Sequence, residues 1–493
     1  MCAKTDTSGD EMNAVPGSFD EITPAWCEWA LKKDGTIGEN TTVTTAKVER
    51  FKDEITGEVN DGGGLTGAKL IRINLGYGGE TNGGEPESVV SKIMFESKET
   101  VSLPWRIVLY LTGAWDLTSE DFWRTDIKFF RNILPVIETK YKSPKVYYTG
   151  IMDNGNRNFF TSTILNRPCK VKTVTLMEDM KNWDGLTLTK LFNGKGIDLE
   201  DAAECLRNLA VLHATFWGEN KPDIQRKFKR LSFMESTARP QAHSKMYARK
   251  RNKFISTADT IQKGVQTVTQ RWQHESYMTI SAGNKSKIPD WFTAEPLEDG
   301  SWPILKDPLI LEMLNACAER FPAFAKSVAN PHLKKPMQTI CHGDFQVGNH
   351  MYGKNENKGK IVAVDFQCVG MGMAVSEVLF YNMWTLPAKN FIESGKVYHD
   401  ALVRNGVDDY PWDAFKKDLI TEVMEHVIKT TLDFSEYTMK KYEQLFRLFG
   451  DKAEGFKVFL EGGVCGMAYI LATDLYLRDK ENFLHCEAFD KNI

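Results

Sequence analysis

The sequence predicts an α+β fold in which a small β-rich N-terminal lobe precedes a large, mainly α-helical C-terminal lobe. Two observations predict it. Short runs in which apolar and polar residues alternate, separated by glycine clusters, dominate the first part of the chain. After Trp183, apolar residues recur every three or four positions, as in amphipathic helices. We therefore expect a flexible lead at 1–17, a β-rich lobe at 18–176 and a linker at 177–180. A helical lobe follows at 181–493, with a helical insertion at about 219–335.

Length and charge limit the possible functions. With 493 residues, 42% of them hydrophobic, the chain is long enough for two or three packed units. Its 62 basic and 66 acidic residues give a net charge of −4, which predicts neither nucleic acid nor an anionic membrane as a partner. The nine cysteines form no C-x-x-C pair and the N-terminus lacks the pattern of a signal peptide. These features predict a reduced, cytoplasmic protein.

The expected elements of the β-rich lobe follow from its period. After a helix at 19–33, three strands at 43–51, 68–75 and 88–95 read as an antiparallel meander. An amphipathic helix at 119–138, containing Pro135 near its end, and two further strands at 145–151 and 171–180 complete the lobe. In the helical lobe, the apolar spacing of 199–218 predicts a helix, and two short strands at 340–353 and 360–370 interrupt the later helices.

A glycine-rich turn separates the first two strands. Gly62, Gly64 and Gly67 satisfy G-x-G-x-x-G, a pattern that is weak by itself because glycine-rich hairpins are common. A dinucleotide-binding fingerprint should open a helix, whereas a strand pattern follows here, and Ala68 stands where a Walker A loop needs lysine. Strand, glycine loop and strand together are typical of the phosphate-covering hairpin of protein kinases. A merely flexible turn stays possible.

Lys92 occupies the middle of the third strand, with apolar neighbours on both sides. A lysine in such a position often faces solvent. In a kinase arrangement it binds the α- and β-phosphates of ATP and is held by an acid on the next helix. Asp126 is the candidate for that acid, with Glu120 and Asp121 as neighbours.

The segment "CHGDFQVGNHMY" carries Asp344 and Asn349 five positions apart, the spacing of the kinase catalytic loop, and Asp365 follows in "IVAVDFQ". Phosphoryl transfer needs one carboxylate to face the acceptor hydroxyl and a second to hold Mg²⁺, and an amide oxygen can complete the metal shell. A hairpin whose polar residues cap turns would explain one or two of these residues. It would not explain all three in this order.

These residues resemble the H-G-D-x-x-x-x-N and I-D-F signatures of the aminoglycoside phosphotransferase and choline kinase superfamily. The Asp-Phe-Gln ending, "LAVLHATFW" and "LMEDM" look most like its ecdysteroid-kinase-like, or CHK-kinase-like, branch over about 45–470. The resemblance implies a bilobal protein-kinase-like fold with ATP and Mg²⁺ as cofactors. It makes Asp344 the catalytic base and Asn349 and Asp365 the Mg²⁺ ligands. The remaining implied sites are the phosphate lysine and the linker whose backbone meets adenine: Lys92, Met177, Glu178, Asp179 and Met180.

Some positions depart from the family pattern or have simpler explanations. Asp126 stands where the family usually has glutamate, and Ser376 and Glu377 stand where an aspartate commonly follows the metal strand. His342 is expected to brace the catalytic loop, and His213 and His350 are expected to be core residues. The aromatic residues are candidates to line a substrate pocket for a quaternary ammonium or a flat apolar ring, although core packing is the simpler explanation: Trp217, Tyr381 and Trp384.

The sequence thus predicts an ATP- and Mg²⁺-dependent small-molecule kinase that phosphorylates a hydroxyl group. The alternatives are a catalytically weak or inactive nucleotide-binding scaffold on the same fold and a glycine-loop oxidoreductase that uses NAD. The acceptor stays open among amino alcohols, sugars and steroid-like alcohols, because a fold does not fix its substrate.

Overall fold

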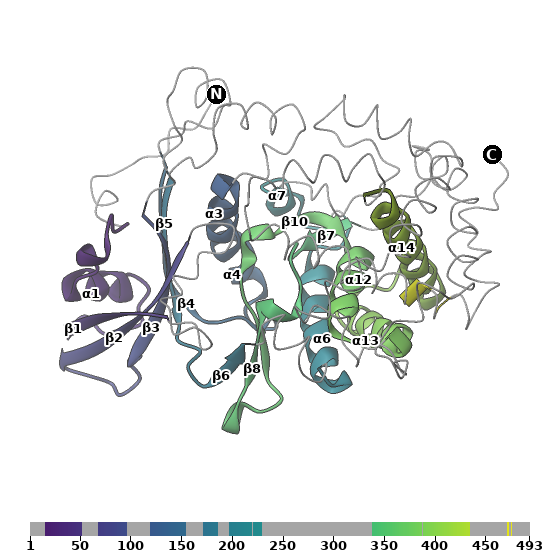
Figure 1. Ribbon diagram of the computed structural model, residues 1–493. Helices are drawn as coiled ribbons and strands as arrows, with labels where there is room; N and C mark the ends of the chain where they lie inside the picture. Colours follow the sequence, from purple (N-terminus) through teal and green to yellow (C-terminus); the bar gives the residue numbers. More distant parts are fainter. Residues whose placement is uncertain are drawn as a thin grey trace, which may run out of the picture. The chain divides into compact units, whose positions relative to one another are not determined.

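The protein is described by a computed structural model (Figure 1). The residues that it describes are 15–51, 68–95, 119–153, 171–185, 197–218, 220–228, 338–386, 388–433, 471, 472 and 475. The chain forms two compact units. Unit 1 comprises 1–184, 353–357 and 362–369, and unit 2 comprises 185–352, 358–361 and 370–493. Unit 1 therefore includes two late segments that the predicted linker at 177–180 would assign to the helical lobe.

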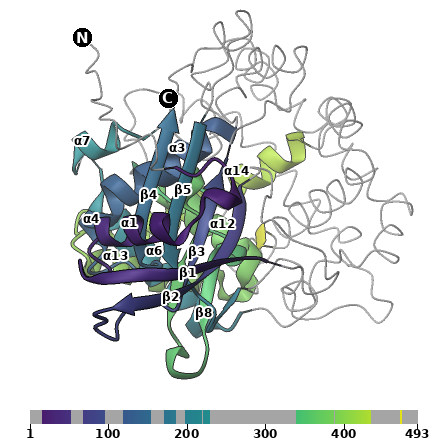
Figure 2. The same ribbon diagram turned by 90° about the vertical axis from the view of Figure 1, so that its left-hand side faces the viewer.

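A five-stranded antiparallel sheet forms the centre of unit 1 (Figure 2). Its strand order is β1-β2-β3-β5-β4. The strands are β1 (Thr41–Arg50), β2 (Lys69–Gly79), β3 (Ser88–Met94), β4 (Val146–Asp153) and β5 (Val171–Glu178). The predicted meander of three antiparallel strands is confirmed, and β3 is central because β5 pairs with its other edge.

Helix α1 (Pro24–Lys33) covers one face of this sheet. Its start is set locally, because the Thr23 hydroxyl accepts the Trp26 N–H and Pro24 occupies the first turn, where a missing N–H costs nothing. Trp26 and Leu31 of the helix join Val89 and Ile93 of β3 in the largest described core of unit 1. Alternate residues of β3 therefore point to this core, and those between them point to the other face.

A helical segment at Ser119–Ile137 contributes to unit 1 as α3 (Ser119–Lys128), the π-helical turn η4 (Phe129–Ile133) and α4 (Leu134–Ile137). The predicted helix is present, and it runs through Pro135 instead of stopping there. Proline has no N–H to bond to the carbonyl four residues earlier, so a helix that continues through it must widen or bend. The π-helical turn immediately before Pro135 fits that requirement.

Unit 2 is mainly helical. Its longer helices are α6 (Leu199–Thr215), α12 (Ala374–Thr385), α13 (Phe391–Arg404) and α14 (Trp412–Asp433). Helix α12 is apolar almost all round and contacts α6, α13 and α14, so it is the central helix of the unit. A two-stranded antiparallel sheet of β7 (Gln338–Cys341) and β10 (Gly370–Met373) leads directly into its first turn.

Short elements complete the described structure. They are α7 (Pro222–Gln225), β6 (Trp183–Gly185), β8 (His350–Gly353), β9 (Ile361–Ala363), and the single turns η2 (Phe19–Glu21), η9 (Val347–Asn349), η10 (Asn355–Asn357), η11 (Phe366–Cys368) and η12 (Ala388–Asn390). An antiparallel sheet in the N-terminal part and a helical C-terminal part confirm the predicted α+β class. None of the helices in the described ranges has the length and apolar character needed to span a membrane.

Candidate active site

Lys92 lies on the sheet face opposite to α1. Its neighbours in β3, Ser91 and Ile93, are fully buried, and Ile93 belongs to the core under α1. Because side chains alternate along a strand, Lys92 points the other way, where its side chain is 15% exposed. The solvent-facing alternative for this lysine therefore does not describe its environment.

Two carboxylates of unit 1 hold the Lys92 ammonium. Its Nζ lies 2.6 Å from Asp365 Oδ1 and 3.1 Å from Asp126 Oδ2. Burial lowers the pKa of Lys92, but the two carboxylates outweigh it and raise the pKa above its ordinary value. Burial raises the pKa of Asp126, and the positive charge of Lys92 partly offsets this increase. The short aspartate side chain at position 126 thus reaches the lysine.

Asp365 has an unusual backbone. Its φ of 66° and ψ of 70° lie in the left-handed region, which non-glycine residues rarely occupy. The flanking contacts fix it there. Phe366 stacks on Phe129 with ring centroids 3.8 Å apart, and the amide of Gln367 donates to Asp365 Oδ2 at 3.0 Å. Strained backbone that its surroundings hold in place is common at functional sites.

The predicted linker begins inside the sheet. Met177 and Glu178 are the last residues of β5, so only Asp179 and Met180 follow the strand. The Asp179 carboxylate is almost buried and accepts two hydrogen bonds from Arg72 and one from Ser88. The side chain of Asp179 thus ties the end of β5 to β2 and β3.

The segment after β7 presents Asp344 in unit 2. Gly343 has φ +86°, a conformation that only glycine adopts easily, and it turns the chain so that Phe345 is fully buried while Asp344 is half-buried. The side-chain N–H₂ group of Asn349 donates to the main-chain oxygen of Asp344 at 2.8 Å and to its Oδ2 at 2.9 Å. The predicted pair is therefore in contact. Asp365 belongs to unit 1. The joint action of Asp344, Asn349 and Asp365 at one metal ion therefore stays a prediction.

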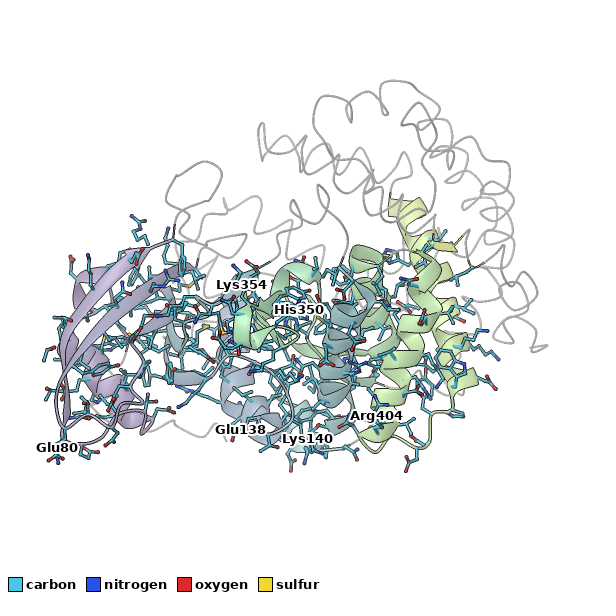
Figure 3. All side chains as sticks on the ribbon, turned by 90° about the horizontal axis from the view of Figure 1, so that it is seen from below. Glu80, Glu138, Lys140, His350, Lys354 and Arg404 are labelled. Atoms are coloured by element: carbon cyan, nitrogen blue, oxygen red, sulfur yellow. The ribbon has the colours of Figure 1, made fainter. Side chains whose placement is uncertain are left out.

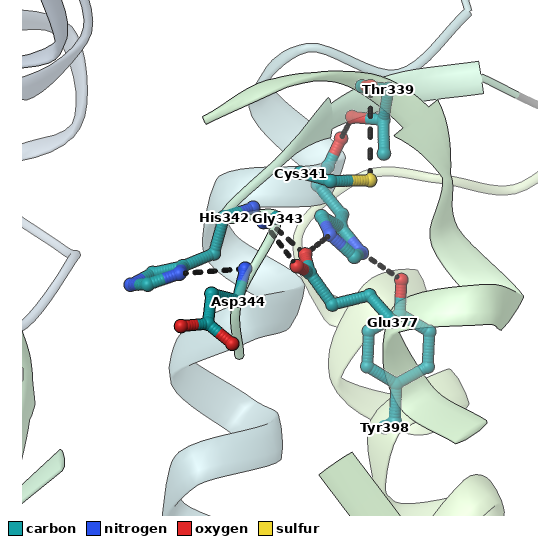
Figure 4. A network of polar contacts seen from close by, with 8 residues as sticks. Thr339, Cys341, His342, Gly343, Asp344, Glu377 and Tyr398 are labelled. Atoms are coloured by element: carbon teal, nitrogen blue, oxygen red, sulfur yellow. Dashed lines mark hydrogen bonds and ion pairs between the residues drawn. The ribbon is translucent and has the colours of Figure 1, made fainter. Parts of the chain in front are cut away.

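A buried network of hydrogen bonds supports this loop (Figure 4). Glu377, in the first turn of α12, accepts the backbone N–H of His342 at 2.9 Å and that of Gly343 at 2.6 Å. His213 of α6 places its Nε2 3.0 Å from Glu377 and its Nδ1 2.6 Å from the Tyr398 hydroxyl. Both side chains of the His213–Glu377 pair are fully buried.

The same network contains a set of ligand-type atoms. His213, Cys341 and Glu377 each offer one such atom, and these lie within 4.8 Å of one another. Both ring nitrogens of His213 and both oxygens of Glu377 already take part in hydrogen bonds. Burial raises the pKa of Cys341, which keeps its thiol protonated. Hydrogen bonding accounts for this cluster without a metal ion.

The histidines and aromatic residues near the loop are core residues. His342 and His350 are fully buried, and the His342 Nδ1 accepts the Asp344 N–H at 3.4 Å, a weak bracing contact. The ring of His350 (labelled in Figure 3) packs against Phe345, and burial lowers the pKa of His350 to about 3. Tyr381 is also buried against Phe345. The side chain of Trp384 and the glycines Gly62, Gly64 and Gly67 lie outside the described residues.

Comparison with protein-family models places the chain. Residues 67–406 match the model of the ecdysteroid kinase-like family, which is more than half of the sequence. The chain belongs to the ecdysteroid kinase-like family. The match includes Lys92, Asp344 and Asp365 and confirms the predicted resemblance. This places the chain among small-molecule kinase-like phosphotransferases.

Solved structures similar to this ecdysteroid kinase-like chain are remote. A Plasmodium vivax ethanolamine kinase is 12% identical, covering 88% of this chain and 83% of its own, with a TM-score of 0.32. A spectinomycin phosphotransferase is 10% identical (90% and 98% covered, TM-score 0.34), and a microcompartment-associated aminopropanol kinase is 11% identical (90% and 94%, TM-score 0.36). Neither fold nor function is inferred from them. A search of curated proteins finds no match.

Sequence reasoning missed part of the site of this ecdysteroid kinase-like chain. It treated Glu377 only as a departure from the family pattern and His213 as a core residue. A signal for Glu377 was present, because an acid inside the apolar run "GMAVSEVLFYNMW" must find buried hydrogen-bond donors. No comparable signal showed that the donors would be backbone N–H groups of the loop that carries Asp344.

Proposed function

We propose that this protein is an ATP- and Mg²⁺-dependent kinase that transfers the γ-phosphate to a hydroxyl group of a small metabolite. The acceptor class is an amino alcohol, a sugar or a steroid-like alcohol. Membership of the ecdysteroid kinase-like family supports this proposal. The observation that carries it is the Asp344–Asn349 pair, because its hydrogen bonds give each side chain a separate task.

The donor set fits a magnesium ion. Asn349 uses its N–H₂ group on Asp344, so its carbonyl oxygen Oδ1 is the atom left for a cation. Asp365 would supply a carboxylate oxygen, and both are the oxygen ligands that Mg²⁺ prefers. When bound, Mg²⁺ would neutralise charge on the phosphates of ATP.

The remaining roles belong to side chains of the protein. Asp344 would accept the proton of the acceptor hydroxyl through its carboxylate, which Asn349 orients. Lys92 would bind phosphate oxygens with an ammonium that its two carboxylates keep protonated. Asp126 would hold Lys92 in position. The backbone of Met177, Glu178, Asp179 and Met180 would contact adenine. The glycines Gly62, Gly64 and Gly67 would contact the phosphates.

The test compares wild-type protein with Asp344→Asn. Purified full-length protein is incubated with Mg²⁺ and ATP and a panel of hydroxylated metabolites, and phosphorylated products are measured by mass spectrometry. We expect Asp344→Asn to lower transfer by about 100- to 10,000-fold, the usual contribution of a general base, with ATP affinity nearly unchanged. Asp409→Asn, an exposed aspartate of the same unit, is the control and should transfer normally.

The alternative is a kinase-like scaffold that binds nucleotide without transferring phosphate. It predicts ATP binding by both proteins, equal background rates of ADP release, and no product with any acceptor. That result would overturn the proposal of an active kinase. Phosphoryl transfer by the wild-type protein and its loss in Asp344→Asn would exclude the scaffold alternative.

A further inference from the structure

The loop that carries Asp344 is attached to the interior of unit 2 through one carboxylate. Glu377 accepts two consecutive backbone N–H groups, from His342 and Gly343, at 2.9 and 2.6 Å. These residues immediately precede Asp344, so the position of Glu377 sets the backbone from which the Asp344 side chain extends. Figure 4 shows both contacts on the one carboxylate, so a rotation of the Glu377 side chain would alter both hydrogen bonds together.

Glu377 needs a further partner to stay in that position. Its side chain is fully buried, and a buried carboxylate is costly unless hydrogen bonds compensate for the lost water. His213 supplies the third contact, at 3.0 Å from Glu377 Oε2, the same oxygen that accepts the His342 N–H. The Tyr398 hydroxyl, 2.6 Å from the other ring nitrogen, fixes the ring plane of His213.

The backbone of His213 is held as firmly as its ring. The Thr339 hydroxyl of β7 donates to the His213 carbonyl oxygen at 2.7 Å, which joins α6 to the strand that leads into the loop. Helix α6 also packs closely on α13, the helix of Tyr398. His213 is therefore a rigid donor fixed at its backbone and at both ring nitrogens.

We propose that His213 is a positioning residue for phosphoryl transfer: it orients Glu377, and Glu377 orients the backbone that presents Asp344. The proposal rests on the proposed kinase function, in which Asp344 is the base. His213 itself touches neither substrate nor nucleotide. Loss of His213 changes the placement of Asp344. It leaves Lys92 and its two carboxylate partners intact, because these residues belong to unit 1.

Two substitutions separate this role from simple packing. Glutamine places its amide near the position of the histidine Nε2, so His213→Gln keeps a donor to Glu377. Asparagine places its amide near Nδ1, so His213→Asn keeps the Tyr398 contact and loses Glu377. The control is His399→Asn, a buried histidine of α13 that bonds the Tyr410 carbonyl oxygen at 2.8 Å and has no described contact with the loop.

The first readout is ADP release from Mg²⁺ and ATP with the acceptor found in the panel. Displacing a catalytic group by about 1 Å can cost about 100-fold, so we expect kcat of His213→Asn to fall by about 30- to 100-fold with KM for ATP within about threefold. His213→Gln should stay within about fivefold of wild type, and His399→Asn should match it. Equal kcat losses in the asparagine and glutamine variants would overturn the proposal.

The second readout does not depend on catalysis. Hydrogen exchange of the peptide covering 338–346 reports the N–H groups of His342 and Gly343 directly. We expect faster exchange in His213→Asn than in His213→Gln and His399→Asn, under conditions where all remain folded by circular dichroism. Unchanged exchange in His213→Asn would overturn the positioning role even if wild-type protein proves inactive, and inactivity alone would overturn only the kinase function.

Discussion

Replacing Lys92 by methionine should destabilise the protein strongly, and more so at high pH. Methionine keeps an unbranched side chain, one atom shorter, and removes its charge. Lys92 is the described cation between Asp126 and Asp365, so the substitution leaves two buried or half-buried carboxylates facing each other. The effect on folding is therefore expected even without nucleotide.

The contact distances give the magnitude. At an effective dielectric constant of about 20, unit charges 2.6 and 3.1 Å apart attract by about 6 and 5 kcal/mol. Much of this attraction offsets the cost of removing the three charges from water, and breaking a buried ion pair typically costs about 3–5 kcal/mol. We expect a loss of that size in the free energy of unfolding.

The pH dependence has a definite sign. Lys92 lowers the pKa of Asp126, against the burial that raises it, so removing Lys92 raises this pKa further. A carboxyl whose pKa is higher in the folded state contributes stability below its unfolded pKa and loses it as the pH rises through the folded value. The cost of Lys92→Met should therefore grow as the pH rises above the ordinary pKa of an aspartate, with a slope of up to about 1.4 kcal/mol per pH unit, and it should be larger at about pH 8 than at about pH 4.5.

Urea unfolding followed by tryptophan fluorescence measures this effect, with midpoints compared at the two pH values. The matched control is Lys47→Met, an exposed lysine in β1 of the same sheet, for which the change should stay within about 0.5 kcal/mol. A Lys92→Met protein as stable as wild type, or a loss that is the same at both pH values, would refute the electrostatic reasoning.

Three further predictions concern neighbouring contacts. Asp179→Ala removes the charge-assisted bonds to Arg72 and should lower the free energy of unfolding by about 1.5–3 kcal/mol, and an unchanged melting temperature would contradict the role of this tie. His350 has a folded pKa of about 3 against 6.5, so acid favours the unfolded wild-type protein. Below about pH 6.5, the free energy of unfolding of His350→Asn should therefore rise relative to wild type by up to about 1.4 kcal/mol per pH unit. Parallel pH profiles of the two proteins in urea unfolding would contradict a lowered pKa of His350. Phe129→Leu removes the ring stacked on Phe366 and should cost about 1–3 kcal/mol in urea unfolding, and a neutral effect would exclude that contact as a support.

The strands and the lysine could be predicted because they depend on local pattern. Alternation of apolar residues in β2 and β3 sets which side chains face α1, and the same alternation places Lys92 on the other face. The sequence also offered Asp126 as the acid on the following helix, with Glu120 and Asp121 as its neighbours. The structure brings Asp126 to Lys92, a choice that depends on where the helix meets the sheet.

Other features depend on contacts between distant segments and gave no sequence signal. The left-handed backbone of Asp365 is held by Phe129 and Lys92, which lie more than 200 positions earlier in the chain. The hydrogen bonds of Glu377 depend on how β10 delivers α12 beside β7. Side-chain pattern predicts which residues are buried, but not which backbone N–H group a buried carboxylate will meet.

The order of segments in unit 1 has a practical consequence for dissecting the protein. Residues 353–357 and 362–369 return to this unit long after its first stretch has ended at Asp184. A fragment cut at 184 would keep the whole five-stranded sheet, yet Lys92 would lose one of its two carboxylates and Phe129 would lose its stacked ring. The segments of the two units therefore alternate along the amino-acid sequence, and a single truncation cannot yield either unit intact.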